Sequence, residues 1–134
     1  MYIKIILFIL ISVNSYNLFS QSKSIYEPKR YENAYFKEGE DSLIRFINKN
    51  LVYPDSTEMV SEDYISSFQI SFMIDTFGKT YNYKVNNGFN SEKLNKTLIS
   101  KIEKNMPYWI PKKDLNKNRK IKSKNYIPIY INIQ

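Results

Sequence analysis

The sequence predicts an α+β domain in which two helices pack on one face of a small, mostly antiparallel three-stranded sheet. Residues 65–75 alternate apolar and polar side chains, which is typical of a strand with one buried face. Residues 39–51 and 91–106 repeat apolar side chains every three or four positions, as amphipathic helices do. Residues 126–133 alternate again. The order of helix, hairpin, helix and strand closes most simply as two layers.

The first predicted helix covers residues 39–51. Glu40 and Asp41 suit its first turn, because carboxylates are stabilised at the positive end of the helix dipole. The helix has to end before Pro54, since the residue that precedes a proline is pushed out of the helical region. We expect its apolar stripe to pack on the sheet. The stripe consists of Leu43, Phe46, Ile47 and Leu51, with Ile44 at its edge.

Residues 76–79 predict a tight turn that joins two strands into a hairpin. Gly78 suits a turn position that needs a positive φ. The second strand follows from the alternation of Tyr81, Tyr83 and Val85 with polar residues. The first strand is expected to bury Phe68, Ile70, Phe72 and Ile74.

The second predicted helix begins after a cap at Asn90 or Ser91. Its stripe is expected to be core and consists of Leu94, Leu98, Ile102 and Met106, with Ile99 beside them. Trp109 follows in an extended segment between two prolines, and we expect its ring to fill one end of the core while its N–H reaches a partner. The alternative is that the ring stacks on a ligand.

The last predicted strand should lie at an edge of the sheet. Pro128 has no N–H to donate, which disfavours a position between two other strands. The alternation places one set of side chains toward the core and the other set away from it. The first set is Ile127, Ile129, Ile131 and Ile133, and the second is Tyr126, Tyr130 and Asn132.

The 134 residues have room for one domain. A short basic start and an apolar run at 5–11 predict a signal peptide at 1–21, followed by a short lead-in at 22–34 and the domain at 35–134. The alternative is an uncleaved anchor, but crossing a bilayer needs about 20 apolar residues. We therefore expect export to the periplasm or outer envelope, with no stable membrane span after cleavage.

Composition argues against catalysis. The chain has no Cys and no His, which removes disulfides, thiol nucleophiles, Cys/His zinc sites and imidazole-based triads. Carboxylates such as Asp41, Asp55 and Asp75 each suit a structural position and form no obvious pair. With three Gly in the chain, no phosphate-cradling loop can be assembled. We expect binding without catalysis, with no cofactor and no metal.

A run of basic side chains precedes the last strand and is opposed only by Asp114. We expect it to be a solvated loop; the alternative is a site for phosphate groups, anionic lipid or an acidic partner. Nucleic acid is not expected as a partner, because the chain is predicted to be exported and strand positions account for the flanking rings. The run consists of Lys112, Lys113, Lys117, Arg119, Lys120, Lys122 and Lys124.

Five landmarks follow one another along the chain at residues 36–40, 50–54, 75–79, 105–111 and 126–133. Taken in this order, they resemble the C-terminal domain of TonB-type energy transducers in its Bacteroidetes-type version, over residues 35–134. We expect the chain to depart from that family in having neither a permanent N-terminal membrane helix nor a long Pro-rich span. It also reads Phe36-Lys37-Glu38-Gly39 where many relatives read Phe-Pro-Gly-Gly.

The resemblance implies a transport-related protein that binds an extended segment of an outer-membrane receptor or another envelope protein by strand addition. Tyr126 and Tyr130 would flank the incoming segment, and Asn132 could form a hydrogen bond with it. The alternative is a structural or assembly protein of the envelope that uses the same edge to form a homodimer. The partner-binding residues carried over by position are Val52, Tyr53, Pro54, Tyr126, Ile127, Ile129, Tyr130 and Asn132.

Overall fold

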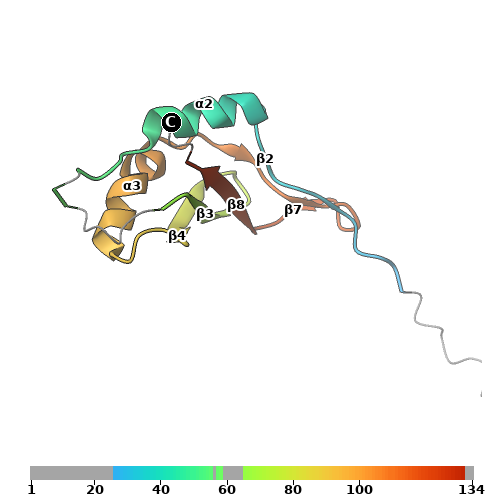
Figure 1. Ribbon diagram of the computed structural model, residues 1–134. Helices are drawn as coiled ribbons and strands as arrows, with labels where there is room; N and C mark the ends of the chain where they lie inside the picture. The colour runs from blue at the N-terminus through green and yellow to red at the C-terminus, as the bar shows by residue number, and fades with distance from the viewer. Residues whose placement is uncertain (1–25, 56, 59–64, 132–134) are drawn as a thin grey trace, which may run out of the picture.

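The computed structural model describes residues 26–55, 57–58 and 65–131 (Figure 1). This part of the chain forms two helices and several antiparallel sheets, which confirms the prediction of an α+β domain. The predicted signal peptide lies outside the described residues. In chain order the elements are β1 (Tyr31–Glu32), β2 (Tyr35–Phe36), α2 (Glu40–Asn50), β3 (Ser67–Ile74), β4 (Thr80–Asn86), α3 (Glu92–Asn105), β5 (Trp109–Ile110), β6 (Lys113–Asp114), β7 (Arg119–Lys120) and β8 (Ser123–Tyr130).

The main sheet has the strand order β4–β3–β8, and both of its pairings are antiparallel. The four apolar side chains of β3 are almost fully buried, as their alternation predicts. Ser71, on the opposite face of β3, is buried as well. Lys84 of β4 and Tyr126 of β8 are its cross-strand partners, and these long side chains flank it on the central strand.

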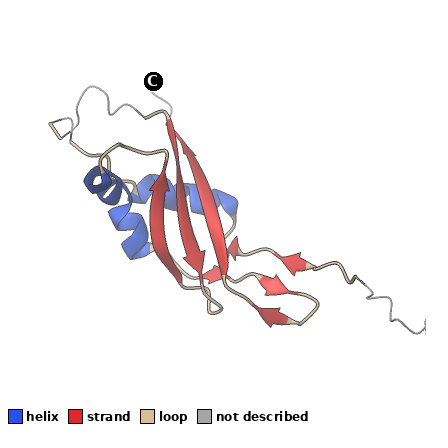
Figure 2. Cartoon of the chain, turned by 90° about the horizontal axis from the view of Figure 1, so that it is seen from below, coloured by secondary structure: helices blue, strands red, loops and turns tan. Residues whose placement is uncertain are grey.

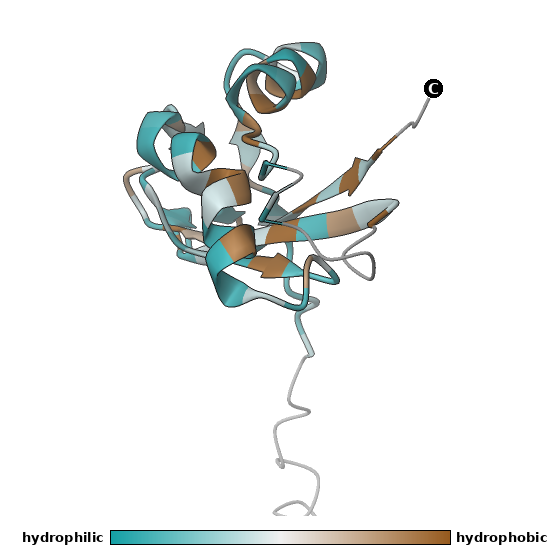
Figure 3. Cartoon of the chain, turned by 60° about the vertical axis from the view of Figure 1, so that its left-hand side comes forward, coloured by the Kyte–Doolittle hydropathy of each residue, from teal (hydrophilic) through white to brown (hydrophobic). Residues whose placement is uncertain are grey.

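Both helices begin and end close to where the sequence predicts. Gly39 is the N-cap of α2 and has a positive φ of 88°. Ser91 is the N-cap of α3, and its hydroxyl oxygen accepts a hydrogen bond from the N–H of Leu94 at 3.4 Å. Figure 2 shows the two helices behind the long strands, and Figure 3 shows hydrophobic and hydrophilic residues on different sides of each helix.

One hydrophobic core joins the helices to the main sheet. Ile47 of α2 and Ile127 of β8 belong to it, together with the buried faces of β3 and α3. The helices also contact each other at their C-terminal ends, where the Asn105 side chain donates to the side-chain oxygen of Asn50 at 3.0 Å. The α3 residues in the core are Leu94, Leu98, Ile99 and Ile102.

The described residues form two further small sheets beside the main one. β2 pairs with β5, and β6 lies between β1 and β7. The sequence predicted a single sheet, so these five two-residue strands are a correction. The lead-in at 22–34 supplies β1, and the stretch predicted as a solvated loop folds into the β6–β7 hairpin.

The β3–β4 turn packs directly on the backbone of β5. Gly78 has a φ of 91°, and its carbonyl oxygen accepts a hydrogen bond from the N–H of Trp109 at 2.9 Å. A Cβ at position 78 would collide with the carbonyl oxygen of Trp109. Within the turn, Asp75 Oδ1 accepts from the N–H groups of Phe77 and Lys79. The turn therefore needs glycine for conformation and for close approach.

Neither helix in the described ranges is both long and apolar enough to cross a membrane.

Candidate binding groove

β8 is an edge strand, as Pro128 predicts. It pairs with β3 along its whole length, and no other strand of the described residues pairs with its opposite side. An edge strand presents unpaired N–H and C=O groups, which form a template for another chain.

The pairing register shows which backbone groups of β8 face outward. The N–H of Ile131 donates to the carbonyl oxygen of Ser66 at 2.8 Å, directly after the cross-strand pair Ser67–Tyr130. Hydrogen-bonded and non-hydrogen-bonded pairs alternate in an antiparallel ladder. Odd-numbered residues of β8 therefore bond to β3, and the backbone groups of Tyr126, Pro128 and Tyr130 face away from it. Proline occupies one of the outward positions, where β3 requires no donor.

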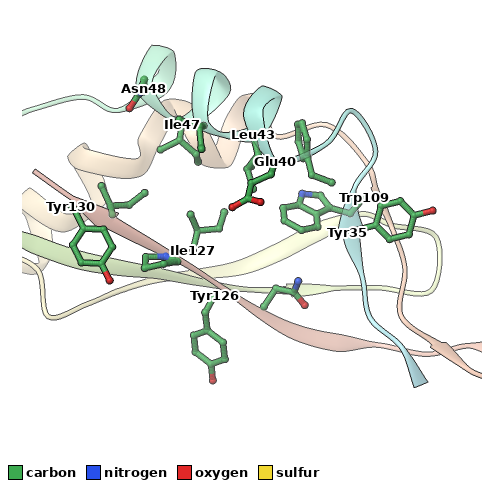
Figure 4. A pocket seen from close by; sticks show the side chains of 14 residues that line it. Tyr35, Glu40, Leu43, Ile47, Asn48, Trp109, Tyr126, Ile127 and Tyr130 are labelled. Carbon is green, nitrogen blue, oxygen red and sulfur yellow. The ribbon is translucent and has the colours of Figure 1, made fainter. Parts of the chain in front are cut away.

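Helix α2 lies along this open edge, and a groove of about 720 Å³ separates the two elements (Figure 4). β2 and β5 form the wall near the start of α2. Residues from three stretches that are distant in the sequence, 35–48, 109 and 125–130, thus meet at one surface. The lining consists of Tyr35, Phe36, Glu40, Leu43, Ile44, Ile47, Asn48, Trp109, Asn125, Tyr126, Ile127, Pro128, Ile129 and Tyr130.

The groove is mainly apolar and its rim is accessible. Ile44 on α2 is 51% exposed, and on the opposite side Tyr130 of β8 is 77% exposed. Large apolar side chains that stay exposed on both sides of a groove mark a surface for a partner. Glu40 is the one acidic residue among those that line the groove, and Figure 4 shows its carboxylate below the first turn of α2.

Trp109 forms part of the groove wall and holds an unpaired donor. Its ring is 6% exposed and makes edge contacts with Phe36 and Phe72, with ring centroids 5.5 and 5.3 Å away. The prediction that this ring belongs to the core is confirmed. Its N–H, predicted to reach a partner, has no acceptor for Nε1 within the described residues. A buried donor without an acceptor costs about 1–3 kcal/mol.

An occupant of the groove could remove that cost. Figure 4 draws the indole nitrogen on the edge of the ring nearer to α2. A backbone carbonyl of an extended segment is an acceptor of suitable size and polarity. The packing of Phe36 and Phe72 against the ring favours a hydrogen bond over ligand stacking as the role of Trp109 toward a ligand.

The residues predicted for partner binding divide into two sets. Tyr126, Ile127, Ile129 and Tyr130 line the groove. Residues 52–54 do not: the N–H of Val52 donates to the carbonyl oxygen of Leu98 on α3 at 3.0 Å, and Pro54 is buried. Asn132 lies outside the described residues.

Sequence reasoning missed the α2 side of the groove. Leu43 and Ile47 belong to an apolar stripe, and such a stripe predicts packing in the core. The pattern does not indicate that one side of the stripe borders a groove. The signal that could have indicated it is Ile44, an apolar residue at the edge of the stripe.

Two further observations concern the ionisable side chains of the described residues. In the part of the chain that the structure describes, no group of three or more acidic side chains is placed to hold a metal ion. Tyr83 on β4 has a shifted pKa: burial raises it to about 12, with a smaller contribution from Glu103, while the hydrogen bond to Thr80 opposes the rise. Tyr83 does not line the groove.

Comparisons with protein-family models, with curated proteins and with solved structures found no match.

Proposed function

We propose that this protein is an exported, non-enzymatic binding module that accepts an extended protein segment as an additional strand on β8. The observation that carries the proposal is the position of the open edge: the outward backbone groups of Tyr126, Pro128 and Tyr130 lie on the rim of an apolar groove. In strand addition, main-chain hydrogen bonds supply affinity and pockets for alternate side chains supply specificity.

The register specifies how such a segment would lie. Its residues opposite Tyr126 and Tyr130 would exchange hydrogen bonds with them and turn their side chains to the open face of the sheet. The residues between would turn their side chains toward α2, against Leu43 and Ile44. Opposite Pro128 the segment could donate an N–H but would find no donor for its own carbonyl. We therefore expect a segment with apolar side chains at alternate positions.

The order of landmarks adds the partner class. It resembles the C-terminal domain of TonB-type transducers, with two helices on one face of a three-stranded sheet and a terminal edge strand. The order β4–β3–β8 supports this resemblance. On that basis the partner is an outer-membrane receptor or another envelope protein, and the role is related to transport.

The alternative function is self-association in an envelope assembly through the same edge. A two-fold β8–β8 pairing centred on Pro128 would place two prolines opposite each other, so both of their carbonyls would lack a donor. A pairing with a different segment leaves one carbonyl without a donor. Because orphaned polar groups are costly, the register favours a different partner over a second copy.

The test is a titration of the ¹⁵N-labelled protein, expressed from the full chain, with strand peptides derived from candidate receptors. We expect the NMR shifts to concentrate in residues 126–130 and in the side of α2 that borders the groove. Trp109 is the single tryptophan of the chain, so its fluorescence reports the same event independently. The control is the same peptide N-methylated at the residues that face Tyr126 and Tyr130. Small shifts spread uniformly over the chain would overturn the proposal.

A further inference from the structure

The β1–β6–β7 sheet and its connecting residues, 26–32 and 112–122, form a basic arm. Figure 2 shows these short strands extending beyond the end of the main sheet, away from the helices. Eight Lys and Arg residues against three acidic ones give the arm a charge of +5, whereas the whole chain carries +7. Most of the net charge is therefore on one projecting element.

The positive charge of the arm is not neutralised from within the described structure. The ion pair found there joins Lys93 to Glu58, both outside the arm. Asp114, one of the three acids, is engaged in the hairpin turn, where its Oδ1 accepts from the N–H groups of Asn116 and Lys117 at 3.0 and 3.1 Å. The cations of the turn and of β7 are exposed.

The arm is an ordered element and not a loose loop. Asn116 in the hairpin turn ties it to the preceding segment, because its side chain accepts from the N–H of Arg30 at 3.1 Å and donates to the carbonyl oxygen of Pro28 at 3.3 Å. Leu115 donates its N–H to the carbonyl oxygen of Arg30 at 3.0 Å. The cations are thus held together on one support.

Apolar side chains are exposed among these cations. Leu115 in the turn is 43% exposed and Tyr31 on β1 is 41% exposed. One face of the Tyr31 ring is covered by the ammonium of Lys112, 4.4 Å from its centroid. A covered ring is a poor platform for stacking a base, whereas a leucine and a tyrosine amid lysines suit the boundary between headgroups and acyl chains.

We propose that the basic arm is a docking site for an anionic lipid bilayer, and that it acts independently of the groove. Lipid phosphates would neutralise the exposed cations while Leu115 enters the headgroup region. The groove lies on another part of the molecule, so the protein could hold a partner segment while it rests on the bilayer.

The test is co-sedimentation of the full chain with phosphatidylcholine vesicles that contain or lack phosphatidylglycerol. The arm variant carries Lys117→Glu, Arg119→Glu and Lys120→Glu. The matched control carries the same change of charge on the helices, as Lys49→Glu, Lys96→Glu and Lys101→Glu, at exposed positions. Residues 1–25 are the same in the parent and in every variant. Any contribution of the apolar run at 5–11 to vesicle binding is therefore common to all of them and cancels in the comparison. Circular dichroism confirms that each variant is folded.

We expect the parent to bind phosphatidylglycerol vesicles more tightly at low salt, and the arm variant to bind at least about a hundredfold more weakly, since each basic residue near an anionic surface contributes roughly fivefold. The helix control should lose far less. Leu115→Ser should weaken binding about fivefold, and the groove variant Tyr130→Pro should bind as the parent does.

Three results would overturn the assignment. The first is equal weakening by the arm and helix variants, which would indicate a response to net charge alone. The second is Leu115→Ser binding as tightly as the parent. The third is equal, arm-dependent affinity for a single-stranded oligonucleotide, which would identify a general polyanion site.

Discussion

Two glycines of this protein share a backbone conformation but differ in what surrounds them. Gly39 and Gly78 have φ values of 88° and 91°. A Cβ at Gly39 would meet nothing within 4 Å, whereas one at Gly78 would collide with the carbonyl oxygen of Trp109. The pair therefore separates the cost of conformation from the cost of close approach.

Gly39→Ala is expected to lower the free energy of unfolding by about 1–3 kcal/mol through strain alone. Gly78→Ala should lower it by about 2 kcal/mol more, because the β3–β4 turn has to move away from β5. Urea denaturation of both variants measures the difference. Equal losses would show that the contact between turn and β5 contributes nothing.

Tyr83 links stability to alkaline pH. Burial raises the pKa of its hydroxyl from 10.0 to about 12, so the folded state keeps this proton over a range in which the unfolded chain has lost it. The stabilisation is complete below pH 10 and is lost as the pH rises from 10 to 12. The side chain is partly exposed, which reduces the size of the effect.

Tyr83→Phe should therefore show a smaller decline in the free energy of unfolding between pH 10 and pH 12 than the parent. The ring keeps its stacking on Phe72, whose centroid lies 5.3 Å away, so the fold should be preserved. Urea denaturation at several alkaline pH values checks this. Parallel pH profiles for the two proteins would contradict it.

At Trp109, replacing the indole N–H by sulfur tests the unpaired donor with little change of shape. Benzothienylalanine at this position should leave the stability of the free protein unchanged or slightly higher, because the orphaned donor is gone. Affinity for a strand peptide should fall about fivefold, the equivalent of one hydrogen bond. Calorimetric titration and urea denaturation separate the two effects. Unchanged affinity would mean that the occupant does not accept from Nε1.

At the scale of elements, the backbone N–H and C=O groups of alternate β8 residues face in opposite directions. Ile129 bonds to Phe68 of β3, while Tyr130 presents its backbone to solvent. Tyr130→Pro should leave the fold intact, as Pro128 does naturally, but remove an outward donor and weaken strand addition about fivefold or more. Ile129→Pro should instead cost about 1–3 kcal/mol of stability, because it leaves the Phe68 carbonyl without its donor.

Denaturation and peptide titration of both variants, with Tyr130→Ala as the side-chain control, distinguish these outcomes. If Tyr130→Pro bound the peptide as the parent does, addition at this edge would be excluded. If Ile129→Pro were as stable as the parent, the register would be wrong.

The longer elements could be predicted from the sequence because each buries one side. Burial of one side imposes an apolar repeat of two residues on β3 and of three to four residues on α2 and α3. Gly39 and Ser91 mark the starts of the two helices. The two-residue strands could not be predicted. β6 and β7 are short, exposed or half-buried and rich in lysine, so no burial pattern distinguishes them from a loop.

The candidate site was predictable in part for a similar reason. Pro128 indicates an edge because its missing donor is a local property of one residue. The opposite wall of the groove depends on where α2 lies relative to β8, which is a tertiary fact that no local pattern encodes. The family resemblance assigns residues 52–54 to the partner surface by position, whereas in the structure the N–H of Val52 bonds to Leu98 of α3 and none of the three residues lines the groove.

At the scale of the whole molecule, the charge distribution and the edge together predict the state of association. The arm carries +5 of the net charge of +7 and directly precedes β8 in the chain. Edge strands in natural proteins are protected from self-pairing by charge and by proline. β8 has both kinds of protection, a charge at Lys124 and a proline at Pro128.

We therefore expect sedimentation equilibrium at physiological salt, where interactions between charges are screened beyond about 8 Å, to show a monomer at protein concentrations up to about 100 μM. Pro128→Val restores an outward donor and should raise self-association, because a two-fold β8–β8 pairing would then have a donor for every outward carbonyl at its centre. Lys124→Gln in the same background should raise it further. Dimerisation of the parent at micromolar concentration, with no tighter dimer for Pro128→Val, would contradict this prediction. Self-association would then be the function of this edge, and its partner would be a second copy of the chain and not a segment of a different protein.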